Sequence, residues 1–167
     1  QLYRVDMRLR PFGKAGALVP SRKAIAAYYG SHAEPWEILA LSRSRQLGKD
    51  PSVEWEKLVF EHCFKLSVNE FVLSEILAMR HRIEDEAPQD DLKRGKGGIR
   101  DIEFLVQTLQ LVHAHAEPSM QKCLSTLSAL NLLIEGGYLE SHVHRALHNG
   151  YTFLRQLEHR CQLVGDQ

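Results

Sequence analysis

Leu92-Lys93-Arg94-Gly95-Lys96-Gly97-Gly98-Ile99-Arg100-Asp101-Ile102-Glu103 is the stretch around which the chain is organised. A segment rich in glycine and cations runs there directly into apolar residues at helical spacing. The stretch closes a polar region, residues 85–98, which also holds Pro88 and is the one long break between helical patterns. We therefore predict a loop over 85–98 that separates two groups of helices.

Helical patterns fill the chain on both sides of this loop. Apolar residues recur at the i, i+3, i+4 and i+7 positions that form one face of a helix. Glycine favours helix ends at Gly30 and at the pair Gly136-Gly137. Proline after an acidic residue favours the first turn of a helix at three places: Pro35, Pro51 and Pro118. The patterns predict a mainly α-helical bundle of about seven helices over residues 21–167, the first around residues 24–29.

Residues 3–10 have a different period. Tyr3, Val5, Met7 and Leu9 alternate with charged residues, which predicts a half-buried β-strand that ends at Pro11. One or two strands do not form a stable sheet in water. We therefore expect residues 1–20 to be the last strand or strands of an α/β domain whose other strands lie upstream, in a longer protein.

Composition narrows the class of protein. Apolar residues make up 44% and charged residues 25% of the 167 residues, which excludes a disordered or membrane-spanning chain. Lys+Arg and Asp+Glu are both 21, so no overall basicity favours nucleic acid. Three widely spaced cysteines indicate buried, reduced thiols in a cytoplasmic protein. Residues 1–50 carry nine Lys/Arg and four Asp/Glu, so a phosphate-bearing ligand is expected first at this end.

The glycine-rich segment is a candidate phosphate site. Its glycines allow close approach of the backbone, and a helix N-terminus offers unpaired N–H donors with partial positive charge. It is not a P-loop, because no strand precedes it and no Lys-Ser/Thr pair follows. The alternative is a flexible surface loop that caps the helix behind it.

Two further features have a structural and a functional interpretation. Arg100, Glu103, Gln107 and Gln110 form one polar stripe, either a solvated helix face or, for Arg100 and Glu103, part of a shared site. Asp6 is either an ion-pair partner of the neighbouring arginines or a ligand of Mg²⁺, which carboxylates on adjacent strands hold for phosphoryl or nucleotidyl transfer. The nine histidines match no zinc motif, and we interpret them as structural.

Four ordered motifs carry a resemblance to a known family. They are, in chain order, Val5-Asp6-Met7-Arg8-Leu9-Arg10-Pro11-Phe12-Gly13, Trp36-Glu37-x-x-Ala40-Leu41, Lys93-x-Gly95-x-Gly97-Gly98-Ile99-Arg100-Asp101-Ile102-Glu103-Phe104-x-Val106-Gln107 and Tyr151-x-Phe153-Leu154-Arg155-x-Leu157-Glu158-His159. On these motifs the chain resembles bacterial glutamine synthetase adenylyltransferase, also called the adenylyl-removing enzyme, over nearly its whole length. Ser44 departs from the Lys/Arg-Ala-Arg run that is more usual in the family.

The resemblance implies a fold and an activity. The family has two nucleotidyltransferase halves of the DNA polymerase β type, each followed by a helical domain. One half attaches AMP to a tyrosine of glutamine synthetase, and the other removes it by phosphorolysis, yielding ADP. This chain would contain the last catalytic strand of one half and its helical domain, with motifs closer to the N-terminal, adenylyl-removing half. The remaining catalytic elements would lie upstream, so we expect no activity from the chain alone.

The resemblance also implies site residues and partners. Asp6 would be the third metal-binding carboxylate, holding Mg²⁺, while Arg8 and Arg10 face the nucleotide phosphates. Lys93, Gly97, Gly98 and Arg100 would close over the same phosphates, with Glu103 orienting Arg100. The implied partners are glutamine synthetase, the PII signal protein and ATP, ADP or phosphate, with no nucleic acid and no membrane.

Two other interpretations stay open at the level of sequence. The helical portion is, in the first, a docking module for glutamine synthetase or the PII protein with no residue in the chemistry. In the second, it is a helical regulatory domain of a related uridylyltransferase, which shares a Gly-Gly-x-Arg-Asp element but fits the other three motifs poorly.

Overall fold

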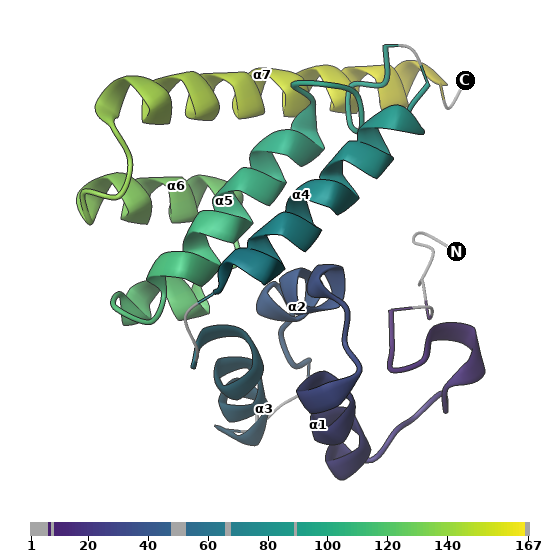
Figure 1. The fold of residues 1–167 in the computed structure, drawn as a ribbon. Helices are drawn as coiled ribbons and strands as arrows, with labels where there is room; N and C mark the ends of the chain where they lie inside the picture. Colours follow the sequence, from purple (N-terminus) through teal and green to yellow (C-terminus); the bar gives the residue numbers. More distant parts are fainter. Residues whose placement is uncertain (1–6, 8, 48–52, 66–67, 89, 166–167) are drawn as a thin grey trace.

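The computed structural model describes residues 7, 9–47, 53–65, 68–88 and 90–165 (Figure 1). Seven α-helices account for most of this part of the chain, which confirms the predicted number. Their bounds are α1 (Arg22–Ser31), α2 (Pro35–Ser42), α3 (Val53–Val59), α4 (Glu70–Asp85), α5 (Ile99–His113), α6 (Thr126–Glu135) and α7 (Ser141–Gly165). Three short turns complete the order: the 3-10 turns η1 (Gly13–Ala15) and η3 (Pro118–Lys122), and the π-helical turn η2 (Phe60–Phe64).

The predicted N-terminal strand lies mostly outside the described residues. Met7 is in a turn, and Leu9 and Arg10 form a bend that leads into η1. None of the described residues lies in a strand. The strand over residues 3–10 and the domain boundary near residue 20 therefore stay predictions.

The helix starts marked by proline follow the capping rules where the structure describes them. Pro35 is the first residue of α2, and Glu34 caps it in a capping box with Glu37. The Glu37 carboxylate also accepts a hydrogen bond from the Tyr28 hydroxyl at 2.8 Å, which ties α1 to α2. Pro118 begins η3, whereas Pro51 lies outside the described residues.

Helix ends confirm one glycine prediction and correct another. The chain leaves α6 at Gly136 and Gly137, where Gly137 adopts a φ of 73° and the Tyr138 N–H reaches the Leu133 carbonyl at 2.9 Å. The expectation that Gly30 ends α1 is wrong. The Ser31 hydroxyl bonds the Ala27 carbonyl and the helix continues to Ser31, so Gly30 lies within its last turn.

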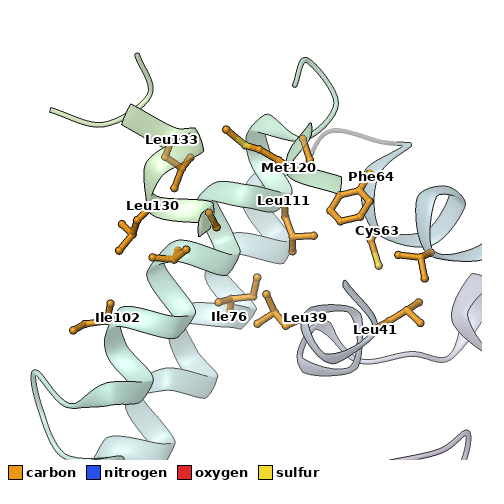
Figure 2. Close-up of a cluster of buried hydrophobic side chains, with 14 residues drawn as sticks. Leu39, Leu41, Cys63, Phe64, Ile76, Ile102, Leu111, Met120, Leu130 and Leu133 are labelled. Atoms are coloured by element: carbon orange, nitrogen blue, oxygen red, sulfur yellow. The ribbon is translucent and has the colours of Figure 1, made fainter. Parts of the chain in front are cut away.

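Helix α5 lies at the centre of the bundle and contacts α2, α4, α6 and α7 (Figure 1). Its apolar side packs against α6, η3 and the α2–η2 region. Figure 2 shows the resulting cluster of buried hydrophobic side chains, to which α5 contributes Ile102 and Leu111. Leu130 and Leu133 of α6 are fully buried there, as is Phe64 of η2. This continuous core fixes α5, and with it the loop that precedes α5.

Two side-chain expectations need correction. The expectation of three buried thiols is wrong, because Cys161 is exposed near the end of α7. Cys63 is buried, and burial raises the pKa of its thiol to about 12. Trp36, a predicted core residue, is 42% exposed because α2 directs its buried side, with Leu39 and Leu41, at the core instead. No helix in the described ranges is long and apolar enough to span a membrane.

Candidate functional site

The loop between α4 and α5 forms backbone hydrogen bonds within itself and to the first turn of α5. Its carbonyls at Leu92 and Lys93 accept the N–H groups of Ile99 (3.0 Å) and Arg100 (2.9 Å), the first two residues of α5. The Gly98 N–H donates to the Gly95 carbonyl at 2.9 Å. The N–H donors at the start of α5, which were expected to be free for a phosphate, are therefore already used.

Two glycines are required by this capping geometry. Gly97 has a φ of 73°, a left-handed conformation that is costly for other residues. A Cβ atom on Gly98 would lie 2.7 Å from the Gly95 carbonyl oxygen and 2.8 Å from that of Leu92. The double glycine thus lets the loop fold back onto the start of α5.

Asp101 fixes the loop from the side of α5. Its carboxylate accepts two hydrogen bonds from the Arg80 guanidinium of α4, at 2.9 and 2.8 Å, and one from the Gly97 N–H at 2.7 Å. Burial disfavours its charge, but the bonds from Arg80 and Gly97 outweigh burial and lower the pKa of Asp101. Sequence reasoning missed Arg80 and Asp101, because their pairing joins two helices across the loop.

Six charged or polar side chains gather where the loop meets α5 and α7. We call this set the Arg155 cluster. It includes three of the predicted site residues and three residues of α7, all three from the last of the four sequence motifs. Its members are Lys93, Arg100, Glu103, Tyr151, Arg155 and Glu158.

Buried Glu103 and partly exposed Arg155, whose side chain is 34% exposed, form the centre of this cluster. Their closest atoms, Glu103 Oε1 and Arg155 Nη2, are 2.7 Å apart, and Glu103 is 9% exposed. The Tyr151 hydroxyl donates to Glu103 at 3.2 Å and accepts from Arg155 Nε at 3.1 Å. Burial disfavours the charge of Arg155, but its bonds to Tyr151 and Glu158 prevail and raise the pKa of the guanidinium.

Lys93 of the loop and Arg100 at the start of α5, a pair that we call the loop cations, lie at the outer side of the cluster. Arg100 Nη1 is 3.5 Å from Glu103, and Lys93 Nζ is 3.9 Å from Glu158. Their side chains are 44% and 48% exposed, so both reach solvent. The structure thus brings Lys93, Arg100 and Glu103 together and places Gly97 and Gly98 in the backbone turn beside them, while their role in binding phosphate stays a prediction.

Arg43 is a further, partly buried cation near this cluster. Its Nη1 donates to the Cys123 carbonyl at 3.4 Å, while Nε and Nη2 are buried without a hydrogen-bond partner. Burial lowers the pKa of Arg43, whereas the nearby Glu103 and Tyr151 act in the opposite direction. This cation therefore adds positive potential behind Glu103.

The polar stripe on α5 is not a solvated face. Glu103 enters the Arg155 cluster, and Gln110 is 1% exposed. The Gln110 side-chain amide donates to the Cys123 carbonyl at 2.8 Å and to the Met120 carbonyl, so it caps the η3 region. Glu103 and Gln110 do lie on α5, as the spacing predicts. The interpretation of the stripe as a solvated helix face is wrong for these two residues, because α7 covers Glu103 and η3 covers Gln110.

The predicted N-terminal part of the site stays untested. Asp6 and Arg8 lie outside the described residues. Arg10 Nε donates to the Gly16 carbonyl at 3.3 Å, and its Nη1 to that of Met7, so Arg10 stabilises its own turn. Phe12 packs edge-on against Tyr28 of α1, 4.7 Å between ring centroids. In the described ranges no group of three or more His, Cys, Asp or Glu residues could hold a metal ion.

Comparison with known proteins gives two family matches. Residues 71–167 match the model described as GlnD PII-uridylyltransferase, and residues 1–59 match that of glutamate-ammonia ligase adenylyltransferase. Three relatives are bifunctional glutamine synthetase adenylyltransferase/adenylyl-removing enzymes. That of Corynebacterium diphtheriae is 42% identical over 96% of this chain, that of Corynebacterium glutamicum 39% over 96%, and that of Idiomarina loihiensis 35% over 100%. The chain spans 16–18% of the length of these relatives.

Both family models describe nucleotidyltransferases, so the chain is part of a protein of this class. The larger match covers the helices that carry the Arg155 cluster. The chain belongs to the glutamine synthetase adenylyltransferase/adenylyl-removing enzyme family, and residues 71–167 carry the helical module that also fits the uridylyltransferase model. The uridylyltransferase interpretation and the adenylyltransferase interpretation are therefore related, not exclusive, over this module.

Proposed function

We propose that this chain is the phosphate-facing helical portion of one half of an enzyme that adds AMP to, or removes it from, a tyrosine of glutamine synthetase. The observation that carries the proposal is the pair of half-exposed loop cations, Lys93 and Arg100, held in front of the buried carboxylates of the Arg155 cluster. Such a pair suits the oxygens of a nucleotide or of inorganic phosphate. The reaction is nucleotidyl transfer from ATP or phosphorolysis that yields ADP.

The N-terminal segment supplies the metal side of the proposed site. Asp6 is a hard oxygen donor of the kind that Mg²⁺ prefers, and it would hold the ion together with carboxylates on strands upstream. Bound there, Mg²⁺ would neutralise charge on the phosphates. Arg8 and Arg10 would face the same phosphates; Arg10 first has to leave its bonds within the turn at Gly16.

The helical part has a separate task in this proposal. It places Lys93 and Arg100 over the phosphates, and Glu103 orients Arg100 through their ion pair at 3.5 Å. Glutamine synthetase is the proposed protein substrate, and the PII protein a proposed regulator. The free thiols at Cys63, Cys123 and Cys161 fit the reducing cytoplasm, where we place the enzyme.

The first test replaces Asp6 in a full-length enzyme that carries this segment. Asp6→Asn should abolish one of the two activities, addition or removal of AMP, and leave the other intact. The retained activity is the internal control for folding, and the lost one identifies the half to which the segment belongs. Near-normal values for both activities would refute the role of Asp6.

The second test separates catalysis from docking. Hydrogen exchange at residues 91–98 is compared in the full-length enzyme with ATP and Mg²⁺, with inorganic phosphate, and with glutamine synthetase or the PII protein. Protection by ATP or phosphate supports the proposed site. Protection only by a protein partner would instead make the helical portion a docking module.

A further inference from the structure

The two carboxylates of the Arg155 cluster repeat one arrangement. Glu103 directs Oε1 to Arg155 Nη2 at 2.7 Å and Oε2 to Arg100 Nη1 at 3.5 Å. Glu158 directs Oε2 to Arg155 Nη1 at 2.7 Å and Oε1 to Lys93 Nζ at 3.9 Å. Each acid therefore joins Arg155 on its inner side to one loop cation on its outer side.

Arg155 is held firmly enough to organise both acids. All three of its side-chain nitrogens have a partner: Nε donates to Tyr151, Nη1 to Glu158 and Nη2 to Glu103. The guanidinium is planar and presents these donors in a fixed fork, which an ammonium group cannot copy. Tyr151, Arg155 and Glu158 follow at i, i+4 and i+7, so one face of α7 supplies the arrangement.

The outer contacts are longer than the inner ones, and their two cations are somewhat more exposed than the Arg155 side chain, which is 34% exposed. Inner distances of 2.7 Å are those of charge-assisted hydrogen bonds. The outer distances of 3.5 and 3.9 Å exceed the usual range of hydrogen bonds, and both cations are nearly half exposed. Lys93 and Arg100 are thus oriented by the acids while keeping donors for an anion. With Arg155, three cations face two carboxylates, so the cluster has a net positive charge.

We propose that Arg155 is a positioning residue of the phosphate site: through Glu103 and Glu158 it sets the directions of Arg100 and Lys93, with no contact to the substrate itself. Tyr151 supports the same arrangement by bonding both Arg155 and Glu103. The long helix α7 is thereby part of the site, although its residues lie far from the loop in the sequence. This inference rests on the proposed contact between the loop cations and phosphate.

The experiment measures KM and kcat in the full-length enzyme, for the activity that Asp6→Asn abolishes. The varied substrate is ATP or inorganic phosphate, whichever that half uses. Lys93→Ala and Arg100→Ala should each raise KM about tenfold, the loss expected for one charge-assisted hydrogen bond. Arg155→Lys, which keeps the charge but not the fork, should raise it by a similar factor. Tyr151→Phe, which removes only a hydroxyl, should raise it about threefold.

A combined variant tests whether Arg155 acts through the loop cations. With Lys93→Ala and Arg100→Ala both present, adding Arg155→Lys should change KM by less than about twofold, because coupled residues are not additive. Arg145→Lys is the matched control on an exposed part of α7 and should leave KM unchanged. Thermal unfolding of each variant shows whether it is folded at the assay temperature.

The outcomes separate the two claims. If Lys93→Ala and Arg100→Ala leave KM unchanged, the proposed function of the loop fails, and the positioning role fails with it. If these two raise KM but Arg155→Lys and Tyr151→Phe do not, only the positioning role is refuted. An effect of Arg155→Lys that persists in full without the loop cations would also refute it, because Arg155 would then act by another route.

Discussion

Single side chains in this domain depend on partners that lie far away in the sequence. Glu103 is a polar residue on an amphipathic helix, yet it is buried and bonded to Arg155, 52 positions later. Glu37 is similar, because it completes the capping box of α2 and accepts the Tyr28 hydroxyl. Burial and the hydrogen bond to the Glu37 carboxylate raise the pKa of the Tyr28 hydroxyl. Such a residue contributes to stability in proportion to the partners that its removal would leave unpaired.

The first prediction concerns Glu103. Replacement by alanine removes the acceptor of the Tyr151 hydroxyl and one of the two carboxylates that bind Arg155, whose side chain is partly exposed and keeps Glu158. We expect Glu103→Ala to lower the free energy of unfolding by about 1–3 kcal/mol, measured by urea denaturation. Glu140→Ala removes an exposed carboxylate that pairs with exposed His142 and should cost less than about 0.5 kcal/mol. Equal losses from the two variants would contradict the assigned difference.

At the level of elements, the α4–α5 loop and α7 carry the distinctive features of the domain. The loop is a self-bonded cap for α5, and α7 is a 25-residue helix that reaches across α5 and α6 to the loop (Figure 1). Sequence patterns predicted both elements. They did not show that the loop uses its own N–H groups or that α7 faces its cations.

Gly98 tests the capping role of the loop. The Cβ of an alanine there would collide with two backbone carbonyls, those of Gly95 and Leu92, which cannot move without opening the cap. Gly98→Ala should therefore speed hydrogen exchange of the Ile99 and Arg100 amides and destabilise the domain by about 1–3 kcal/mol. Gly95→Ala meets one carbonyl, that of Asp91 at 2.6 Å, and is expected to have a smaller effect on these two amides. Unchanged exchange in Gly98→Ala would exclude the capping geometry.

Gly150 gives a prediction of opposite sign on α7. It lies inside a long helix, where glycine is about 1 kcal/mol less favourable than alanine. An added Cβ would meet only Ile102 Cδ1, at 3.8 Å, an ordinary packing distance. Gly150→Ala should thus raise the free energy of unfolding by about 1 kcal/mol and increase the melting temperature. A loss of stability would mean that α5 and α7 approach more closely than this distance implies.

At the scale of the whole molecule, α5 connects the core to the candidate site. One side of α5 is buried against α6 and η3, and its first turn carries Arg100, Asp101 and Glu103 toward α4, the loop and α7. A change in the loop conformation is therefore expected to alter the packing of α4, α5 and α7. Asp101 is the clearest case, because it joins Arg80 of α4 to Gly97 of the loop.

Stability should depend on pH through Asp101. Its pKa in the folded protein lies below the ordinary value, so the folded state favours the ionised carboxylate. The resulting stabilisation is fully present above the unfolded-state pKa, about 3.9, and is lost as the pH falls through the lowered folded-state value. Urea unfolding between pH 6 and pH 2.5 should show wild type more stable than Asp101→Asn at the upper end, with the gap closing in acid. A constant gap over this range would contradict this assignment.

Helical period, capping residues and ordered motifs are local properties of the chain, so the amino-acid sequence was enough to predict the seven helices, a long break between the fourth and the fifth of them, and the family. It also singled out Lys93, Arg100 and Glu103. The sequence did not reveal that the glycine-rich loop caps its own helix or that Arg155, Tyr151 and Glu158 lie behind the loop cations, which is seen in the three-dimensional arrangement. Burial and ion pairing depend on how helices cross, and periodicity along one helix does not specify which neighbour covers its polar face.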